Sequence, residues 1–230
     1  KDNNHSVSHG LQQAMTYAQM MDLPFAYSSN GDAFYEHDFL TGQEQQIALE
    51  EFPTQEMLVA RYYAELHSGK GISDMEKKIV SQPYYSSQST YPPRYYQRNA
   101  VNRTVEAIAR GQQRLLLVMA TGTGKTYTAF QIVYRLLRSD LKKRILYLAD
   151  RNILVDQSIL QDFAPLEKTI YKVDFSDKEC LSKIASREVN FALYHQMVGQ
   201  NDEEHFKQIP AEYFDLIIVD ECHRGSAKED

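Results

Sequence analysis

Apolar residues along this chain follow two spacings, and the spacing changes from segment to segment. Apolar positions three or four residues apart predict an amphipathic helix, whereas short continuous apolar runs predict buried strands. The helical spacing is found at residues 11–21, 55–67, 94–112, 129–137, 153–163, 178–186 and 203–209. Runs typical of strands are found at residues 25–28, 33–37, 115–119, 145–149, 169–173, 189–194 and 216–219. Strands and helices alternate in the second half, which predicts an α/β fold with a parallel sheet covered by helices on both faces.

Breaks in this pattern divide the chain into three parts. Residues 1–50 contain a helix and two strands, which is typical of the closing part of an α/β unit. Residues 38–54 are acidic and are expected to be irregular. Residues 81–93 are rich in Ser, Pro and Tyr, so residues 51–93 are interpreted as a helical connector and linker. The linker tyrosines are expected to be solvated, to stack on a base or to pack on a neighbouring element.

A phosphate-binding loop is predicted between the apolar run 115–119 and the helix that follows it. Its residues are Thr121, Gly122, Thr123, Gly124, Lys125 and Thr126. The glycines let the backbone curl so that its N–H groups face phosphate oxygens, and the helix N-terminus adds partial positive charge. Lys125 is expected to reach the β- and γ-phosphates of ATP, and the Thr126 hydroxyl to ligate Mg²⁺.

One position departs from the general pattern GxxxxGK[ST]. That pattern requires glycine at position 119, where Met119 stands. The alternative interpretation is an ordinary Gly/Thr turn between a strand and a helix. The flanking elements favour the phosphate loop, because an apolar run precedes it and a helical pattern follows Lys-Thr, as the motif requires.

A pair of carboxylates follows the last apolar run, residues 216–219. Nucleotide hydrolysis needs a carboxylate for Mg²⁺ and a group that orients water. Asp220 is expected to hold Mg²⁺ through water at the end of a buried strand, and Glu221 to orient or activate the attacking water. Acidic residues after apolar strands are common. The prediction therefore depends on their combination with Lys125, which lies 220 − 125 = 95 positions earlier.

Gln97 is a third candidate for nucleotide binding. It lies in the helical pattern ahead of the phosphate loop and follows Tyr95 and Tyr96. Its amide is suited to hydrogen bonding the edge of adenine. The alternative is a solvated residue on the helix surface.

Composition narrows the choice of function class. The chain has 230 residues, 43% of them hydrophobic and 24% charged, with a formal net charge of −6. That charge argues against a surface coated in basic residues, but a local basic groove for nucleic acid is compatible with it. Cys180 and Cys222 lack CxxC spacing and indicate reduced thiols in a cytoplasmic protein. The apolar runs are shorter than the roughly 20 residues of a membrane span, so no membrane is predicted as a partner.

Three segments together resemble motifs of superfamily 2 helicases. Arg94-Tyr95-Tyr96-Gln97, MATGTGKT at 119–126 and DECHRG at 220–225 are similar to the Q motif, motif I and motif II of the DExH type. The resemblance implies that residues 94–230 form the first RecA-like ATP-binding motor lobe, incomplete at its C-terminal end. The segment 145–157 is similar to motif Ia, which in that family lies on the DNA backbone. By that match Arg151 and Gln157 contact DNA, with Arg151 on a phosphate.

The N-terminal part resembles a second family. Gln13 and Tyr17, followed by Pro24-Phe25-Ala26-Tyr27, are similar to the QxxxY end of a PD-(D/E)xK nuclease domain. A nuclease tail, a connector and a DExH motor, in this order, resemble the restriction subunit of type I restriction–modification enzymes. Residues 1–50 would then be the C-terminal part of a nuclease domain, with Lys1 at or just after the nuclease lysine. The chain is accordingly expected to be an internal portion of a longer protein.

This resemblance implies a concrete activity. The expected protein is an ATP-dependent double-stranded DNA translocase and endonuclease subunit, which hydrolyses ATP to pull DNA before cleavage. ATP and Mg²⁺ are the implied cofactors, and modification (methyltransferase) and specificity subunits are the implied partners. Residues 1–230 alone are expected to bind ATP with little turnover, because the second motor lobe would follow them.

Two alternatives stay open from the sequence. One is another DExH helicase acting on DNA or RNA, or a repair translocase. The QxxxY segment favours the nuclease-coupled enzyme over these, because they need no nuclease tail. The other is a scaffold that binds ATP and partners without turnover, against which Glu221 argues, because a pure binder needs no water-orienting carboxylate.

Overall fold

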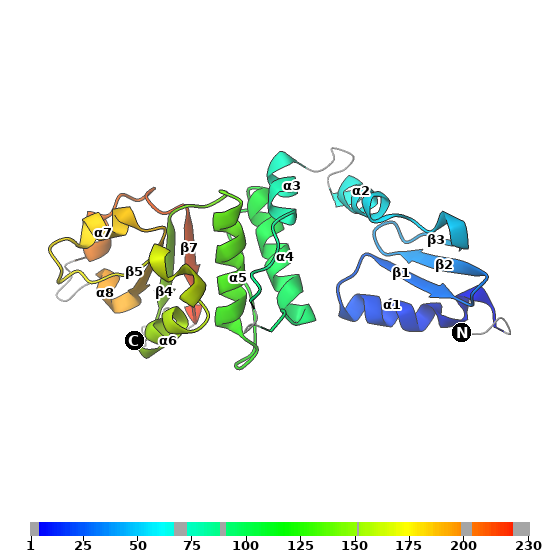
Figure 1. Cartoon of the computed structure of the whole chain (residues 1–230), viewed down its shortest axis with the longest axis horizontal. Helices are drawn as coiled ribbons and strands as arrows, with labels where there is room; N and C mark the ends of the chain where they lie inside the picture. Colours follow the sequence, from blue (N-terminus) through cyan, green and yellow to red (C-terminus); the bar gives the residue numbers. More distant parts are fainter. Residues whose placement is uncertain (1–4, 67–72, 88–90, 151, 199–203, 223–230) are drawn as a thin grey trace, which may run out of the picture. The chain divides into compact units, whose positions relative to one another are not determined.

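The computed structural model describes residues 5–66, 73–87, 91–150, 152–198 and 204–222. These residues form two compact units, each described here by itself. The first unit comprises residues 1–77 and 94–99, and the second comprises residues 78–93 and 100–230. Figure 1 labels most of the helices and strands of both units. Among the described residues, no helix is long and apolar enough to cross a bilayer.

The first unit is built on an antiparallel sheet with the strand order β1-β2-β3. Its elements are the 3-10 helix η1 (Val7–Gly10), α1 (Leu11–Met20), β1 (Phe25–Ser29), β2 (Ala33–Asp38), β3 (Glu44–Ala48), the 3-10 helix η2 (Leu49–Glu51) and α2 (Gln55–Leu66), and α3 (Asp74–Val80) begins in it. Helix α1 packs against β1. The helices predicted at 11–21 and 55–67 and the strands at 25–28 and 33–37 are confirmed.

The prediction that residues 38–54 are irregular is wrong. Strand β3 pairs with β2 in antiparallel register, with Glu36 opposite Gln45 and Phe34 opposite Ile47. Its first three residues are exposed, and Ile47 alone is buried. A polar edge strand is held by backbone hydrogen bonds to its neighbour, so its side chains need not alternate and give no apolar pattern.

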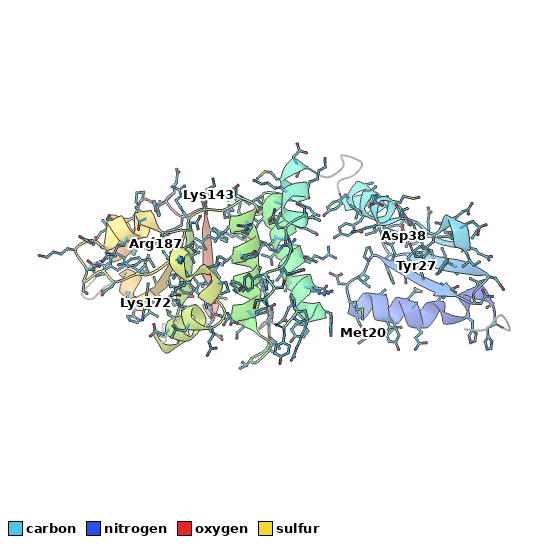
Figure 2. All side chains as sticks on the ribbon, viewed as in Figure 1. Met20, Tyr27, Asp38, Lys143, Lys172 and Arg187 are labelled. Carbon is cyan, nitrogen blue, oxygen red and sulfur yellow. The ribbon has the colours of Figure 1, made fainter. Side chains whose placement is uncertain are left out.

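A buried group of charges fixes α2 against this sheet. Arg61, on α2, donates to Glu36 Oε1 at 2.6 Å, to Glu36 Oε2 at 3.0 Å and to Asp38 Oδ2 at 2.7 Å. The Tyr27 hydroxyl donates to Glu36 Oε2 at 2.6 Å, and the Gln45 amide to Glu36 Oε1 at 3.3 Å. Figure 2 labels Tyr27 and Asp38 in this sheet. We call these five residues the charge cluster of the first unit.

The charge cluster keeps its carboxylates ionised. Burial by itself raises the pKa of Glu36 and of Asp38, but hydrogen bonds and charge from Arg61 outweigh it, and both pKa values lie below their ordinary range. Burial, with the hydrogen bond to Glu36, raises the pKa of Tyr27, so its hydroxyl stays a donor. Buried charges paired in this way are structural, since they make their hydrogen bonds within the first unit.

The second unit contains a parallel sheet with the strand order β5-β6-β4-β7. Its strands are β4 (Ile145–Ala149), β5 (Ile170–Lys172), β6 (Val189–Leu193) and β7 (Leu216–Val219). Its helical elements are α5 (Lys125–Arg138), α6 (Asn152–Leu160), the 3-10 helix η3 (Ala164–Thr169), α7 (Cys180–Ser186), α8 (Tyr194–Val198), the 3-10 helix η4 (His205–Gln208) and most of α4 (Tyr95–Ala109). Every pairing within the sheet is parallel.

Helices cover both faces of this sheet, which confirms the predicted α/β class. One face packs against α5 through Phe130 and Val133, while the other meets Cys180 and Ile184 of α7. Successive side chains of β4 pack on opposite faces of the sheet, because side chains alternate along a strand. In Figure 1, α5 lies between α4 and the sheet. Val101 on α4 belongs to the apolar layer that joins those two helices.

Three predictions for this unit are corrected. Residues 115–119 form no strand: Leu116 is 75% exposed and Val118 is 88% exposed. A strand exists through hydrogen bonds to a partner strand, and no described strand pairs with this run or with the outer side of β7. Strand β7 is therefore half exposed rather than buried. The helix predicted at 203–209 is the short 3-10 helix η4, and α8 was not predicted.

Described residues of the segment 81–93 pack on α5. The buried side-chain amide of Gln131, on α5, accepts from Tyr85 N at 2.9 Å and donates to Tyr85 O at 3.1 Å. The Tyr85 ring meets Phe130 and Tyr134 edge-on. Tyr127 donates its hydroxyl to Tyr91 O at 3.1 Å. Of the alternatives for the linker tyrosines, packing on a neighbouring element is the one found for Tyr85.

Candidate nucleotide-binding site

The predicted phosphate loop leads directly into α5. Gly122 has φ of 78° and Gly124 has φ of 80°, both in the left-handed region that glycine adopts without strain. Thr123 tightens the turn, since its N–H and its hydroxyl both donate to Ala120 O, at 3.3 and 2.6 Å. Gly124 is the N-cap of α5. The helix therefore begins at Lys125, with its unpaired N–H groups and partial positive charge at the loop.

Lys125 meets Glu221 in space. Its Nζ lies 2.6 Å from Glu221 Oε1, although 96 positions separate the two residues. Both side chains are partly exposed, at 30% and 24%. The sheet explains the contact: β7 ends just before Asp220, and the carboxyl ends of parallel strands meet at one edge, where α/β proteins bind ligands. The two halves of the predicted site are thus brought together.

Asp220 is held at several points. Its N–H donates to Leu148 O at 2.9 Å, which extends the pairing of β7 with β4. Its Oδ1 accepts from Glu221 N at 3.0 Å, and its Oδ2 accepts from the Tyr147 hydroxyl at 3.2 Å. The Tyr194 hydroxyl donates to Asp220 O at 3.1 Å. This residue therefore has a defined position at the edge of the sheet.

Glu221 has an unusual backbone. Its φ is 51°, in the left-handed region that non-glycine residues seldom adopt. Such a conformation persists where the surrounding structure fixes it, and it is found disproportionately at functional sites. Here it occurs at the residue that carries the Lys125 contact.

The donor set suits Mg²⁺ bound together with a nucleotide. Within the part of the chain that the structure describes, no group of three or more His, Cys, Asp or Glu residues forms a metal cage. Mg²⁺ at nucleotide sites takes one or two protein oxygens and completes its octahedron with phosphates and water. The Thr126 hydroxyl, on the first turn of α5, provides an oxygen of that kind, and the Asp220 carboxylate can accept from water bound to the metal. The residues present therefore fit Mg²⁺ and a triphosphate.

Comparison with known proteins identifies the family. A family model described as "Type III restriction enzyme, res subunit" matches residues 90–230. The chain belongs to this family of restriction-enzyme subunits. The match includes the phosphate loop and the Asp220-Glu221 pair.

Relatives of the family extend the similarity to the N-terminal part. The endonuclease subunit of the type I restriction enzyme EcoAI of Escherichia coli is 45% identical over 235 residues, which cover 100% of this chain and 28% of that protein. The EcoKI endonuclease subunit of Escherichia coli strain K12 is 32% identical over 224 residues, covering 90% of this chain and 18% of that protein. The chain thus spans less than a third of these curated relatives.

A solved structure agrees with this assignment. It is a fragment of a protein described as an HsdR subunit of a type I restriction enzyme from Vibrio vulnificus YJ016. The TM-score is 0.74 at 37% identity, over 96% of this chain and 38% of that chain. The resemblance to type I restriction subunits is therefore confirmed across nearly all of the chain.

Gln97 is not the solvated helix residue of the alternative interpretation. It is 7% exposed, and its Oε1 accepts from Arg94 N at 2.9 Å, so it caps the first turn of α4. It belongs, with Arg94, to the first unit. Its proposed contact with adenine remains a prediction.

The other predicted site residues have different outcomes. The Gln13 amide donates to the Tyr17 hydroxyl at 3.0 Å, so the two side chains are neighbours on α1. Arg151 lies outside the described residues, and Gln157 lies on α6 with only its backbone described. Cys222, which follows the last strand, is exposed.

Sequence reasoning missed two tyrosines at this site, Tyr147 and Tyr194. Both hydroxyls donate to Asp220. A signal for the first was present, because Tyr147 is the one residue with a polar tip in the run Ile145–Ala149. A hydroxyl in a buried strand usually finds a hydrogen-bond partner, and the partner was not evident without the fold.

Proposed function

We propose that this chain carries the ATP site of a type I restriction subunit, which hydrolyses ATP to pull double-stranded DNA before cleavage. The observation that carries the proposal is the Lys125–Glu221 contact of 2.6 Å, at the start of α5 and beside Asp220. A loop with left-handed glycines, a lysine and two consecutive carboxylates at one sheet edge is the arrangement expected of an ATPase.

Each residue has a distinct task in this proposal. Backbone N–H groups of residues 121–126 hold the phosphates, and Lys125 offsets their negative charge. Asp220 and Thr126 hold Mg²⁺, which supplies charge neutralisation of the triphosphate when bound. Glu221 exchanges its contact with Lys125 for a water molecule and orients that water toward the γ-phosphate. Gln97 is proposed to hydrogen-bond adenine.

The relatives support the rest of the proposal. Residues 1–50 would be the end of a nuclease domain that includes Gln13 and Tyr17, residues 51–93 a connector, and residues 94–230 the first motor lobe. Arg151 and Gln157 would contact double-stranded DNA, and methyltransferase and specificity subunits would be the partners. The similarity to endonuclease subunits of two type I enzymes, over 100% and 90% of this chain, supports these assignments.

ATP hydrolysis by the full-length protein with its partner subunits tests the proposal. Rates are measured with and without long duplex DNA that carries a recognition site. We expect Lys125→Ala and Glu221→Gln each to lower DNA-stimulated hydrolysis by about 100-fold or more, and DNA cleavage to be lost with it. Lys143→Ala, a change in an exposed lysine of the same unit, is the matched control and should leave both activities intact.

Three outcomes would count against this function. Cleavage that survives loss of hydrolysis would separate the nuclease from the motor. Stimulation by RNA instead of duplex DNA would place the chain among other helicases. ATP binding without turnover in the intact complex would favour the scaffold alternative.

A further inference from the structure

Tyr147 has no role in the proposed chemistry, yet its hydroxyl contacts the central carboxylate of the site. It is the middle residue of β4, between β6 and β7, and it is 2% exposed. Its hydroxyl donates to Asp220 Oδ2 at 3.2 Å. A tyrosine phenol is protonated at neutral pH, so this hydroxyl is the donor in the bond.

The ring of Tyr147 is held by aromatic packing. It stacks on Phe191 with ring centroids 4.7 Å apart and meets Phe163 edge-on at 5.7 Å. Both neighbours are fully buried. A side chain confined in this way offers its hydroxyl at one position, so it restricts the orientation of whatever accepts the hydrogen bond.

The Asp220 carboxylate can accept further bonds after these contacts. An ionised carboxylate offers about four lone-pair positions. Among the described residues, Tyr147 uses one on Oδ2 and Glu221 N uses one on Oδ1, which leaves one on each oxygen. In the charge cluster of the first unit, by contrast, Glu36 accepts four hydrogen bonds from Tyr27, Gln45 and Arg61. The difference marks Asp220 as oriented by the protein and still able to bind a ligand.

We propose that Tyr147 is a positioning residue for the Mg²⁺ carboxylate: its hydroxyl fixes the orientation of Asp220 so that one lone pair on each oxygen stays available to Mg²⁺ bound with the nucleotide. The inference rests on the proposed ATP site and adds a residue to it. Outer partners of this kind commonly change metal affinity by about 10–100-fold when they are removed.

Nucleotide affinity tests this role without reliance on turnover. The full-length protein is titrated with a fluorescent, non-hydrolysable ATP analogue, first in EDTA and then over a series of Mg²⁺ concentrations. We expect Tyr147→Phe to bind the analogue as wild type does in EDTA. The strengthening of analogue binding by Mg²⁺ should fall, with the half-saturating Mg²⁺ concentration raised about tenfold. Phe fits this position, because it keeps the ring that packs on Phe163 and Phe191 and removes only the hydroxyl.

Two further variants separate positioning from general destabilisation. Tyr171→Phe makes the same change on β5, two strands away in the same sheet, and should leave the Mg²⁺ series unchanged. In an Asp220→Asn background, Tyr147→Phe should have no further effect, because the residue through which it acts has been altered. Thermal unfolding of each variant is recorded alongside.

The outcomes discriminate. An unchanged Mg²⁺ series in Tyr147→Phe, equal weakening with and without Mg²⁺, or effects that add to those of Asp220→Asn would each overturn the positioning role. If wild type showed no response to Mg²⁺, or if Lys125→Ala bound the analogue normally, the proposed ATP site itself would be wrong. If only the positioning role of Tyr147 is wrong, wild type still responds to Mg²⁺ and Lys125→Ala still binds the analogue more weakly.

Discussion

The acidic residues of the two units differ in burial and in hydrogen bonding. In the first unit, Glu36 and Asp38 lie inside the antiparallel sheet, and Arg61 pairs with both. In the second unit, Asp220 and Glu221 lie at the end of β7 and are partly exposed. A carboxylate that accepts all its hydrogen bonds inside a unit stabilises that unit. A carboxylate at a sheet edge that keeps unused lone pairs can bind a ligand. Carboxylates alone therefore do not mark a site.

The largest effect on stability is expected from Arg61→Met. The change leaves Glu36 and Asp38 without their counter-charge, and breaking a buried pair typically costs about 3–5 kcal/mol. Because Arg61 is itself 32% exposed, we expect about 2–3 kcal/mol here. Hydrogen exchange at the amides of β2 in the full-length protein measures the loss of local stability.

Lys77→Met is the matched control for that experiment. Lys77 pairs with Asp74 at 3.4 Å on the surface, with both side chains well exposed. An exposed pair contributes about 0–1 kcal/mol, so protection of β2 should not change. Equal loss of protection in both variants would show that the charge cluster contributes no more than a surface ion pair.

Acid should weaken the first unit through the same residues, by less than Arg61→Met does, because the side chains remain packed. The pKa values of Glu36 and Asp38 are lowered on folding, so their contribution is complete above the ordinary value of 4.5 for Glu and is lost as pH falls through the lowered values. Burial raises the pKa of Asp162 in the second unit, and its contribution changes in the opposite direction. Hydrogen exchange at pH 5 and at lower pH compares the protection of the amides of β2 with that of the amides of β4.

The smallest effect on stability is expected from Glu221→Gln. The Lys125–Glu221 pair is partly exposed, so its loss should change the unfolding free energy by less than about 1 kcal/mol, in either direction. Thermal or denaturant unfolding of the full-length protein measures it. A loss as large as that of Arg61→Met would mean that Glu221 is held in place for stability, and the contrast between the units would fail.

Local features were predictable from the sequence because they depend on neighbouring residues. The spacing of Gln13 and Tyr17 fixed their contact, and the glycines ahead of Lys125 indicated a turn into a helix, as found. The strands at 145–149 and 189–194 were also predictable, since apolar residues dominate both segments. These signals require only the period of a helix or strand.

Features that depend on a distant partner were not predictable. The run 115–119 has the composition of a strand but lacks a paired neighbour among the described residues, whereas polar β3 is a strand because β2 pairs with it. The capping role of Gln97 and the exposure of Cys222 also follow from packing. Composition shows only that a segment can form a strand, and pairing with a neighbouring strand decides whether it does.

The sequence by itself determined which groups are candidates for the site: a glycine-containing loop before Lys125, an acidic pair after an apolar run, and the order of segments that resembles restriction subunits. Only the tertiary structure decided which of these groups meet. Residues 96 positions apart form the Lys125–Glu221 contact, and a buried tyrosine holds Asp220. The physical reason is that parallel strands bring their carboxyl ends to one edge, an arrangement set by non-local pairing that local sequence patterns do not specify.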